Sequence, residues 1–377
     1  MSNSIRVLQV LHDFKKGGVQ SEVMWPARLL SREDVSFDVV LFSGTEGYYE
    51  KEFKKYGCIF RIILPERKGM ISKLVGIVSN FFFVKNEMMK ILMNAGHYDA
   101  MHVHHPLYNA PCLLAAKKMG IPVRIAHCAV NKPLRKDFRD RLYIRLYYRI
   151  CSWILQSCAT NLYGVTQNAS DYIFGKGKGR MLKNPTLDLE RFNPARFDEK
   201  KDSVLTLIMI GSYSPRKNQN FAVDVLKCLL ERGKDTRLVF IGYPRSAKED
   251  YFPRLQKKVK DLSLDAAVEF LPQDTDIPMA LSKSDFLLIP SLQEGLPNVT
   301  LEAQAMGVPC IISDDVSDDC NCGLCSFIPL DSGAEAWADF ILDEYEKRGE
   351  KHPVDMSAWD NKKVCKEYLE IWRGNMR

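Results

Sequence analysis

Two successive series of short apolar runs, separated by stretches of helical pattern, most strongly limit what this chain can fold into. The first series comprises residues 5–11, 35–42, 99–103 and 123–126, and the second comprises residues 204–210, 238–241, 268–271, 286–289 and 310–312. Nearly continuous apolar strands that alternate with helices form parallel sheets covered on both faces. Two such series therefore predict an α/β protein with two doubly wound, Rossmann-like domains.

The boundary between these domains is predicted from composition. Residues 184–203 are polar, contain two prolines and have no sustained period, which is typical of a linker. The 377 residues suffice for two domains of ordinary size. We therefore expect an N-terminal domain over residues 1–190 and a second domain over residues 203–355. Residues 356–377 form a final helix, on which Trp359, Val364, Tyr368, Ile371 and Trp372 could share one apolar face.

The N-terminus and the cysteines predict a cytoplasmic protein. Residues 1–14 lack the basic segment and long apolar run of a signal peptide, and the apolar stretch 70–84 is too short to span a bilayer. The eleven cysteines should then be reduced thiols. Cys320, Cys322 and Cys325 have a spacing that could bind zinc, but no neighbouring histidine or fourth cysteine completes the set, so we interpret them as a reduced loop.

Residues 132–149 form a strongly basic segment. Seven Lys or Arg side chains alternate with large apolar and aromatic residues in this segment, whereas the net charge of the whole chain is only +6. Such a segment suits the surface of an anionic membrane. A solvated helix that packs on its own domain explains the pattern equally well. No recognition motif accompanies the charge, so nucleic acid is not expected as a partner.

The segment from residue 284 to 314, SDFLLIPSLQEGLPNVTLEAQAMGVPCIISD, is the most informative stretch of the chain. A buried strand leads into a loop with Glu294, and a helix begins near Pro297 or Asn298 and ends at Gly307. The helix N-terminus then lies at the carboxyl edge of a parallel sheet, where amide groups bind phosphates. Glu294 can reach sugar hydroxyls from the loop, and Glu302 can accept hydrogen bonds from a ribose.

This segment resembles the donor-binding motif of the retaining GT-B glycosyltransferases of family 4, in the branch that builds bacterial capsular polysaccharides and exopolysaccharides. The resemblance implies that Glu294 contacts the transferred sugar and that Glu302 binds the ribose. The pyrophosphate would be held by the backbone of Gly295, Leu296, Pro297 and Asn298, with the N–H groups of the residues other than proline as donors. It also implies two domains that face each other across a cleft, with the C-terminal helix crossing back to the first domain.

The turn after the first strand of the second half is the expected phosphate clamp. Gly211 and Lys217 match the family's Gly-Arg-x4-Lys pattern, but Ser212 stands where the arginine is expected. Two adjacent cations at a strand-to-helix turn suit a leaving diphosphate, so Arg216 could compensate. The resemblance assigns the nucleotide base to Leu271, Pro272 and Gln273, and it implies structural roles for Asp276 and Ile277.

In the first half, Gly17 and Gly18 form a glycine turn between the first strand and the first helix, where backbone amides can approach a ligand closely. In the family the equivalent loop lies near the donor phosphate and the acceptor. His127 ends a strand and matches the family's cleft histidine, which contacts the donor sugar. The run His102, His104 and His105 suggests a metal site. Because alternation along a strand would split these side chains between two faces, we expect a structural or acceptor-side role.

The resemblance implies a glycosyltransferase that retains anomeric configuration and needs no metal on the diphosphate. The catalytic candidates are His127, Glu294, Lys217 and Arg216. We expect no cofactor beyond the nucleotide-sugar co-substrate, which is a UDP-sugar by the likeness to exopolysaccharide enzymes. The partner is a saccharide or lipid-linked acceptor, which suits an enzyme on the inner face of the cytoplasmic membrane. Two alternatives stay open: a non-catalytic GT-B partner subunit, which the Ser212 departure suggests, and a sugar-nucleotide epimerase.

Overall fold

The computed structural model describes residues 4–65, 70–105, 108–129, 142–198, 203–244, 250–347 and 354–376. The chain divides into two compact units. Unit 1 consists of Met1–Thr186 together with Ala358–Arg377, and unit 2 consists of Leu187–Ser357. The boundary between the units thus falls inside the predicted linker, residues 184–203, between Thr186 and Leu187. Leu187 and Phe192 of this segment are buried.

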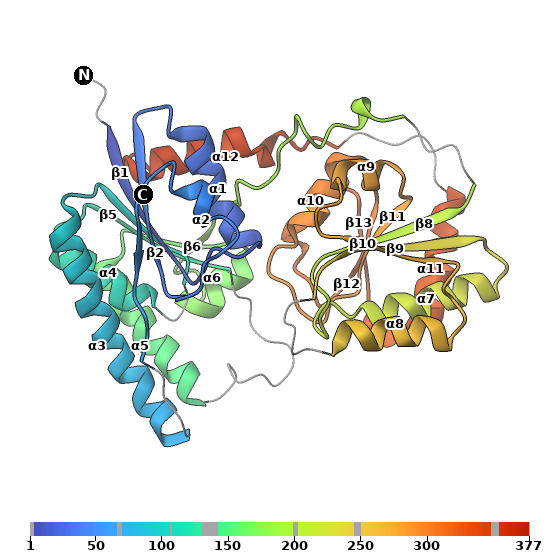
Figure 1. The fold of residues 1–377 in the computed structure, drawn as a ribbon, viewed down its shortest axis with the longest axis horizontal. Coiled ribbons are helices and arrows are strands. Elements are labelled where there is room, and N and C mark those ends of the chain that lie inside the picture. The colour runs from blue at the N-terminus through green and yellow to red at the C-terminus, as the bar shows by residue number, and fades with distance from the viewer. Residues whose placement is uncertain are drawn as a thin grey trace. The chain divides into compact units, whose positions relative to one another are not determined.

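Unit 1 is built on a parallel sheet in the order β3-β2-β1-β4-β5-β6-β7 (Figure 1). The strands are β1 (Ile5–Leu11), β2 (Val35–Leu41), β3 (Ile59–Arg61), β4 (Ala100–Val103), β5 (Val123–Cys128), β6 (Asn161–Gly164) and β7 (Arg180–Met181). The order reverses between β1 and β4, which pair directly from Val7 opposite Ala100 to Val10 opposite Val103. Loops at the carboxyl end of such a switch point are a preferred place for ligands.

The described helices of unit 1 are α1 (Gly18–Leu30), α2 (Glu50–Phe53), α3 (Met70–Ala95), α4 (Asn109–Lys118), α5 (Leu142–Cys158), α6 (Gln167–Phe174) and α12 (Asn361–Trp372). Helix α12 comes from the end of the chain and packs beside α1 (Figure 1). Its residues Val364, Tyr368 and Trp372 are at most 1% exposed and belong to the same core as Val7 and Met24. The apolar face predicted for residues 359–372 therefore completes the core of unit 1.

Unit 2 has a second parallel sheet, in the order β10-β9-β8-β11-β12-β13. Its strands are β8 (Leu205–Ile210), β9 (Thr236–Gly242), β10 (Val268–Pro272), β11 (Phe286–Ile289), β12 (Cys310–Ser313) and β13 (Cys325–Ile328). The helices are α7 (Gln219–Glu231), α8 (Tyr251–Asp261), α9 (Ile277–Ser282), α10 (Asn298–Ala305) and α11 (Gly333–Lys347). Short 3-10 turns occur at Pro194–Arg196, Asp318–Cys320, Leu330–Ser332 and Ser357–Trp359.

The prediction of two doubly wound parallel sheets is confirmed. All nine predicted runs are strands, and the run 286–289 coincides with β11. Four further strands, β3, β6, β7 and β13, were not predicted. They are at most four residues long, and β3, β7 and β13 are edge strands, whereas β6 lies next to the edge. Strands this short show no extended apolar pattern. Within the described ranges, no helix combines the length and the apolarity that crossing a membrane requires.

Candidate functional site

The carboxyl edge of the unit 2 sheet brings two loops together, one after β8 and one after β11. The amide of Leu292 donates a hydrogen bond to the carbonyl oxygen of Arg216 at 2.8 Å, which ties the loops directly. Gly211 has a φ of +149°, and a Cβ on Gly242 would lie 2.2 Å from the Gly211 carbonyl oxygen. Glycine at both positions lets the end of β9 approach the turn after β8 this closely.

Lys217 and Glu294 form the central ion pair of this edge. Lys217 Nζ lies 2.5 Å from Glu294 Oε1, and Ser291 Oγ donates to the same oxygen at 2.9 Å. Glu294 is 7% exposed. Burial opposes its ionisation, but the nearby charges of Lys217 and then Arg216 outweigh burial and hold the pKa of Glu294 below its ordinary value. The sequence assigned these residues separate roles, and the structure joins them as partners.

Ser212 and Arg216 lie on the same turn as Lys217. The Ser212 carbonyl oxygen accepts a hydrogen bond from Gln219 Nε2 at 3.1 Å, which fixes the turn to the start of α7. Arg216 is exposed, and its guanidinium acts on Glu294 through charge. The charges of Lys217 and Arg216 thus both act on one buried carboxylate at this edge.

The loop Gly295–Pro297 leads directly into α10, whose N-cap residue is Pro297 in extended conformation. Thr300 Oγ1 donates to the Pro297 carbonyl oxygen at 2.7 Å, which stabilises this first turn. Asn298 is the first helical residue, as predicted, and Gly307 follows the last turn with a φ of +69°. The positive end of the helix dipole therefore lies four residues after Glu294 in the chain and at the same sheet edge as the Lys217–Glu294 pair.

Glu302 lies in the second turn of α10 and is partly buried. Loss of water around the carboxyl raises its pKa to about 7, and the positive charge of Arg191 offsets only part of that effect. Such a carboxyl changes its charge near neutral pH. A ligand whose hydroxyls donate hydrogen bonds favours its ionised form.

Leu271, Pro272 and Gln273 end and follow β10, which is an edge strand of the unit 2 sheet. Pro272 and Gln273 are exposed, whereas Leu271 is half-buried. Because β9 separates β10 from β8, these residues lie along the same carboxyl edge but two strands away from Gly211. Asp276, which was predicted to be structural, forms an ion pair with Arg191 at 3.5 Å.

In unit 1, Gly17 precedes α1 in extended conformation and Gly18 is the first residue of the helix. Beside this turn, Gln20 Nε2 donates to Asp13 Oδ1 at 2.8 Å. A Cβ on Gly17 would meet the Gln20 side chain at 2.5 Å, so the small residue leaves room for that hydrogen bond.

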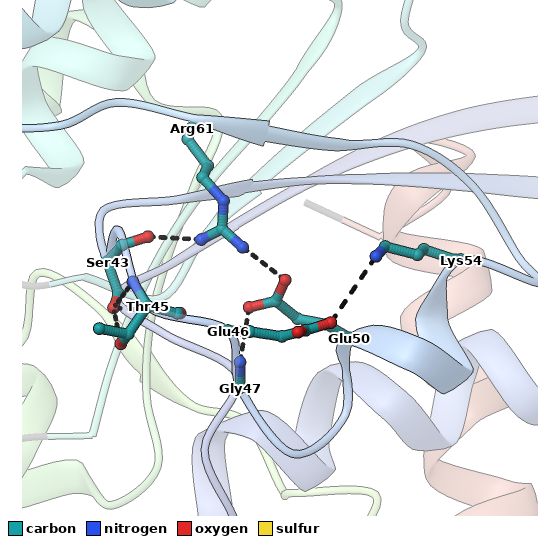
Figure 2. A network of polar contacts seen from close by, with 7 residues as sticks. All are labelled: Ser43, Thr45, Glu46, Gly47, Glu50, Lys54 and Arg61. Atoms are coloured by element: carbon teal, nitrogen blue, oxygen red, sulfur yellow. Dashed lines mark hydrogen bonds and ion pairs between the residues drawn. The ribbon is translucent and has the colours of Figure 1, made fainter.

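A polar network holds the loop after β2 against α2 and β3 (Figure 2). The same loop touches the turn after β1, where the amide of Tyr49 donates to the Phe14 carbonyl oxygen at 3.0 Å. The buried carboxylate of Glu50 pairs with Arg61 and accepts a hydrogen bond from the amide of Gly47 at 2.7 Å. A Cβ on Gly47 would lie 2.5 Å from the backbone of Phe14, so only glycine allows the two loops to touch in this way. The network therefore fixes the loop after β2, and Gly47 lets that loop lie against the backbone of Phe14.

His127 lies inside unit 1, one residue before the end of β5, and is only 1% exposed. Its Nδ1 lies 2.7 Å from Glu22 Oε1, and its ring stacks on His102 at a centroid distance of 5.3 Å. His104 contacts Glu22 as well. The run at residues 102–105 was expected to split between faces, and it does: His102 and His104 share this face, while His105 packs against Phe42 and Tyr108.

Glu22 is the residue that the sequence did not single out. It lies on α1, five residues after Gly17, and it contacts His104, which follows β4, and His127 of β5. The i, i+2 spacing of His102 and His104 was a signal for a shared face, but only the pairing of β4 with β5 brings His127 beside them.

The cysteine loop differs in one respect from its sequence interpretation. Cys310 lies directly opposite Cys325 in the parallel pairing of β12 with β13, so a fourth thiol is near in space although it is ten residues away from Cys320 in the chain. Cys320 is buried and its Sγ donates to the Ser317 carbonyl oxygen at 3.3 Å. The thiols are free, without disulfides.

Most of the basic segment 132–149 lies outside the described residues, because the description resumes at residue 142 with α5. Tyr147 and Tyr148 are buried, so their rings pack within unit 1. Leu146, Ile150 and Trp153 are 56%, 51% and 75% exposed. Their spacing places them on one side of α5, which therefore has an apolar side toward solvent.

Comparisons with known proteins agree with this architecture. Residues 192–318 match the family model of the glycosyl transferases group 1. EpsF of Bacillus subtilis (strain 168), named as a glycosyltransferase, is 29% identical over 357 residues, which cover 90% of this chain and 88% of EpsF. The UDP-Gal:alpha-D-GlcNAc-diphosphoundecaprenol alpha-1,3-galactosyltransferase of Escherichia coli is 25% identical over 80% of this chain and 78% of its own.

The fold is also that of a solved structure, Anabaena HepE in complex with UDP and glucose. The two superpose with a TM-score of 0.66 over 98% of each chain, at 15% sequence identity. At that identity the likeness concerns the fold alone. Two doubly wound units, the group 1 match across the loops after β8 and β11, and these relatives lead to one conclusion: the chain has the GT-B fold, and its residues 192–318 are similar to the glycosyl transferases of group 1.

Proposed function

We propose that this glycosyltransferase moves a sugar, with retention of configuration, from a UDP-sugar to a saccharide or lipid-linked saccharide during polysaccharide biosynthesis. The observation that carries the proposal is the Lys217–Glu294 pair beside the N-terminus of α10. It combines a cation, a buried carboxylate and a helix dipole at one sheet edge. The cation and the helix dipole suit a diphosphate, and the carboxylate can accept hydrogen bonds from sugar hydroxyls.

The pair also suggests how a donor is received. A diphosphate that approaches Lys217 competes with Glu294 for the ammonium group. The Lys217 side chain is 14% exposed. When Lys217 turns to the phosphate, the Glu294 carboxylate becomes an acceptor for hydroxyls of the transferred sugar. Lys217 and Arg216 then stabilise the charge that grows on the leaving diphosphate. His127 does not enter this proposal, because its ring is buried against Glu22 and His102.

The donor and acceptor classes are supported by the relatives. The Escherichia coli relative is named for a UDP-galactose donor and an acceptor on diphosphoundecaprenol. An acceptor of that chemistry lies at a membrane surface, so we place the enzyme on the cytoplasmic face of the membrane. Retention and independence from a metal on the diphosphate rest on the motif resemblance.

A panel of UDP- and GDP-sugars, incubated with the purified chain and with or without membrane extract, tests the function. Transfer of label to a lipid-extractable or polymeric product supports the proposal. Conversion of the sugar without an acceptor would identify an epimerase. Tight nucleotide binding without transfer, hydrolysis or isomerisation would identify a binding partner of another transferase.

The pKa of Glu302 leads to a prediction about nucleotide affinity. Because the free carboxyl has a pKa of about 7, it is mainly protonated at pH 6 and mainly ionised at pH 8. If it accepts hydrogen bonds from the ribose, UDP should bind roughly tenfold more tightly at pH 8 than at pH 6, since one pKa unit is a factor of ten. Titration calorimetry measures this.

Glu302→Gln is the matched control, because it keeps the shape and one acceptor but cannot ionise. At pH 8 it should cost about 1.5–3 kcal/mol of UDP binding, the range for a hydrogen bond to a charged group. Phosphate protonation affects both proteins equally, so only the difference between them reports on Glu302. Equal pH dependence in the two proteins would remove Glu302 from the ribose site.

The apolar side of α5 supports peripheral contact with lipid. Leu146, Ile150 and Trp153 are more than half exposed, and Arg149 on the same helix is exposed beside them. Burying an apolar side chain of this size stabilises by about 1.5–3 kcal/mol, and a cation near an anionic leaflet adds about 1 kcal/mol. Together they would give useful and reversible attachment.

Changing Leu146, Ile150 and Trp153 together to Gln should abolish sedimentation with anionic vesicles at low salt, while UDP affinity stays unchanged. Met279→Gln, which alters an exposed apolar side chain in unit 2, is the control and should sediment as wild type does. Wild-type binding should weaken with added salt, because the charges are screened. A wild-type protein that ignores anionic vesicles at low salt would contradict the membrane proposal.

A further inference from the structure

Four buried side chains converge in unit 1 without a role in the chemistry described above. Glu22 comes from α1, His102 from β4, His104 from the residue after β4 and His127 from β5. Each offers one ligand atom, and these atoms all lie within 4.8 Å of one another. The residues are 1%, 0%, 7% and 1% exposed in that order. The sheet and α1 therefore hold three imidazoles and one carboxylate around a single point.

Several polar atoms of this cluster have no hydrogen-bond partner within the described part of the chain. They are Glu22 Oε2, both ring nitrogens of His102 and Nε2 of His127. Buried polar groups in native proteins are nearly always satisfied, since an unsatisfied one costs about 1–3 kcal/mol. Four such atoms at one point call for a partner that the polypeptide does not supply.

The contacts of His104 indicate what kind of partner is needed. Its Nε2 lies 2.9 Å from Gln9 Oε1, an acceptor, so Nε2 carries the hydrogen. The neutral ring then directs the lone pair of Nδ1 toward Glu22 Oε1, 3.2 Å away. Two acceptors that face each other in a buried site repel, unless a cation lies between them.

We propose that Glu22, His102, His104 and His127 bind one divalent transition-metal ion, with zinc the best fit. Three imidazole nitrogens and one carboxylate oxygen are ligands that Zn²⁺ prefers in a tetrahedral shell. At Zn–N distances of about 2.0–2.1 Å the ligand atoms lie roughly 3.4 Å apart, so the side chains need to move inward by ~1 Å. Because protein atoms fill all four positions, the ion has a structural role.

The surroundings resemble the outer shell of a metal site. The Gln9 side chain accepts from His104 Nε2 and thereby orients the ring, and Tyr368 Oη donates to Glu22 Oε1 at 2.9 Å. Such outer partners fix the tautomer and orientation of metal ligands. Through Tyr368 the site also includes α12, so the ion would tie α1, β4, β5 and α12 together. His127 would be a metal ligand, and not the donor-sugar contact that the motif resemblance implies.

Metal content of the full-length chain tests the proposal. The protein is purified without a histidine tag, stripped with a chelator, reloaded with Zn²⁺, desalted and analysed by mass spectrometry of the element. We expect about one zinc per chain, and near-complete loss of it in His102→Gln and in His104→Gln. His105→Gln is the matched control, because His105 faces the other side of the strand.

Cobalt identifies the ligands without relying on a variant that folds. Co²⁺ added to the stripped wild type should give the visible d–d bands of a tetrahedral site without a thiolate charge-transfer band. Cys325→Ser should leave the zinc content unchanged, which separates this site from the cysteine loop. Tyr368→Phe, which removes one outer hydrogen bond, should weaken zinc affinity about 10–100-fold in a chelator competition.

Three results would overturn the proposal. They are a wild type that retains no metal after reloading, zinc that survives in both His102→Gln and His104→Gln, and a cobalt spectrum with thiolate bands that Cys325→Ser abolishes. In the first case the cluster would be an imidazolium–carboxylate pair. None of these outcomes bears on the transfer chemistry proposed above, whose residues Lys217, Arg216 and Glu294 lie in unit 2.

Discussion

Replacing Lys217 with methionine should lower kcat by about 10²–10³-fold with the donor found in the nucleotide-sugar panel. The ammonium group meets a charge that grows on the leaving diphosphate, and removal of one such preorganised partner typically has this effect. The donor KM should change far less, because the α10 N-terminus still binds the ground-state diphosphate. Steady-state kinetics on the purified protein measure both constants.

Two further variants make the result specific. Lys227→Met removes a cation from the exposed pair with Glu231 on α7 and should leave kcat unchanged. Lys217→Met also leaves the carboxylate of Glu294 buried without its ion-pair partner. The double variant Lys217→Met, Glu294→Gln removes that unpaired charge, so it separates the loss of the cation that faces the phosphate from damage to the loop. If both the single and the double variant turn over as wild type does, the phosphate clamp lies elsewhere.

The same kinetic measurement tests whether Arg216 compensates for Ser212. Arg216→Ala should reduce kcat, because its charge reaches the site in the structure through Glu294. Ser212→Arg restores the family's usual residue and should then partly rescue Arg216→Ala. A silent Arg216→Ala, together with a faster Ser212→Arg single variant, would contradict the compensation.

Replacing Trp372 with alanine should destabilise unit 1 by about 3–5 kcal/mol, the usual cost of emptying a large buried aromatic site. Trp372 is 1% exposed, and its ring meets Phe37 of β2 at a centroid distance of 5.6 Å in an edge-on contact. It also lies near His102 and Tyr368. Calorimetry should detect the loss as a lower Tm of the transition that belongs to unit 1.

The chain offers a control with the same substitution. Trp153 is 75% exposed on α5, so Trp153→Ala should change the free energy of unfolding by no more than about 0.5 kcal/mol in the absence of lipid. Equal Tm values for the two variants would mean that α12 does not contribute to the stability of unit 1.

Local patterns made much of this fold and part of the site predictable. Strand β11, the loop with Glu294 and the helix start at Asn298 are adjacent in sequence, so one segment of the chain defines them. Short edge strands such as β3 and β7 were missed, because two or three residues cannot display a period. Contacts between distant residues were missed as well.

The side-chain pairs that organise both units are contacts between residues far apart in the sequence. Lys217 and Glu294 are 77 residues apart in the chain, and Glu22 meets His127 only because α1 packs over the sheet. A single sequence contains no signal for such proximity. The expectation for His127 shows the consequence: its strand was predicted correctly, but not its burial with Glu22, His102 and His104.

The return of α12 to unit 1 has a consequence for biosynthesis. A ribosome finishes α1 early, but α12 emerges only after all of unit 2, residues 187–357, has been made. At about 5–20 residues per second the delay is on the order of 10–30 s. Until then the core that Val23, Ala27 and Leu30 share with α12 stays incomplete on the nascent chain. Unit 2, whose strands are contiguous in the chain, can complete its core before unit 1 receives its last helix.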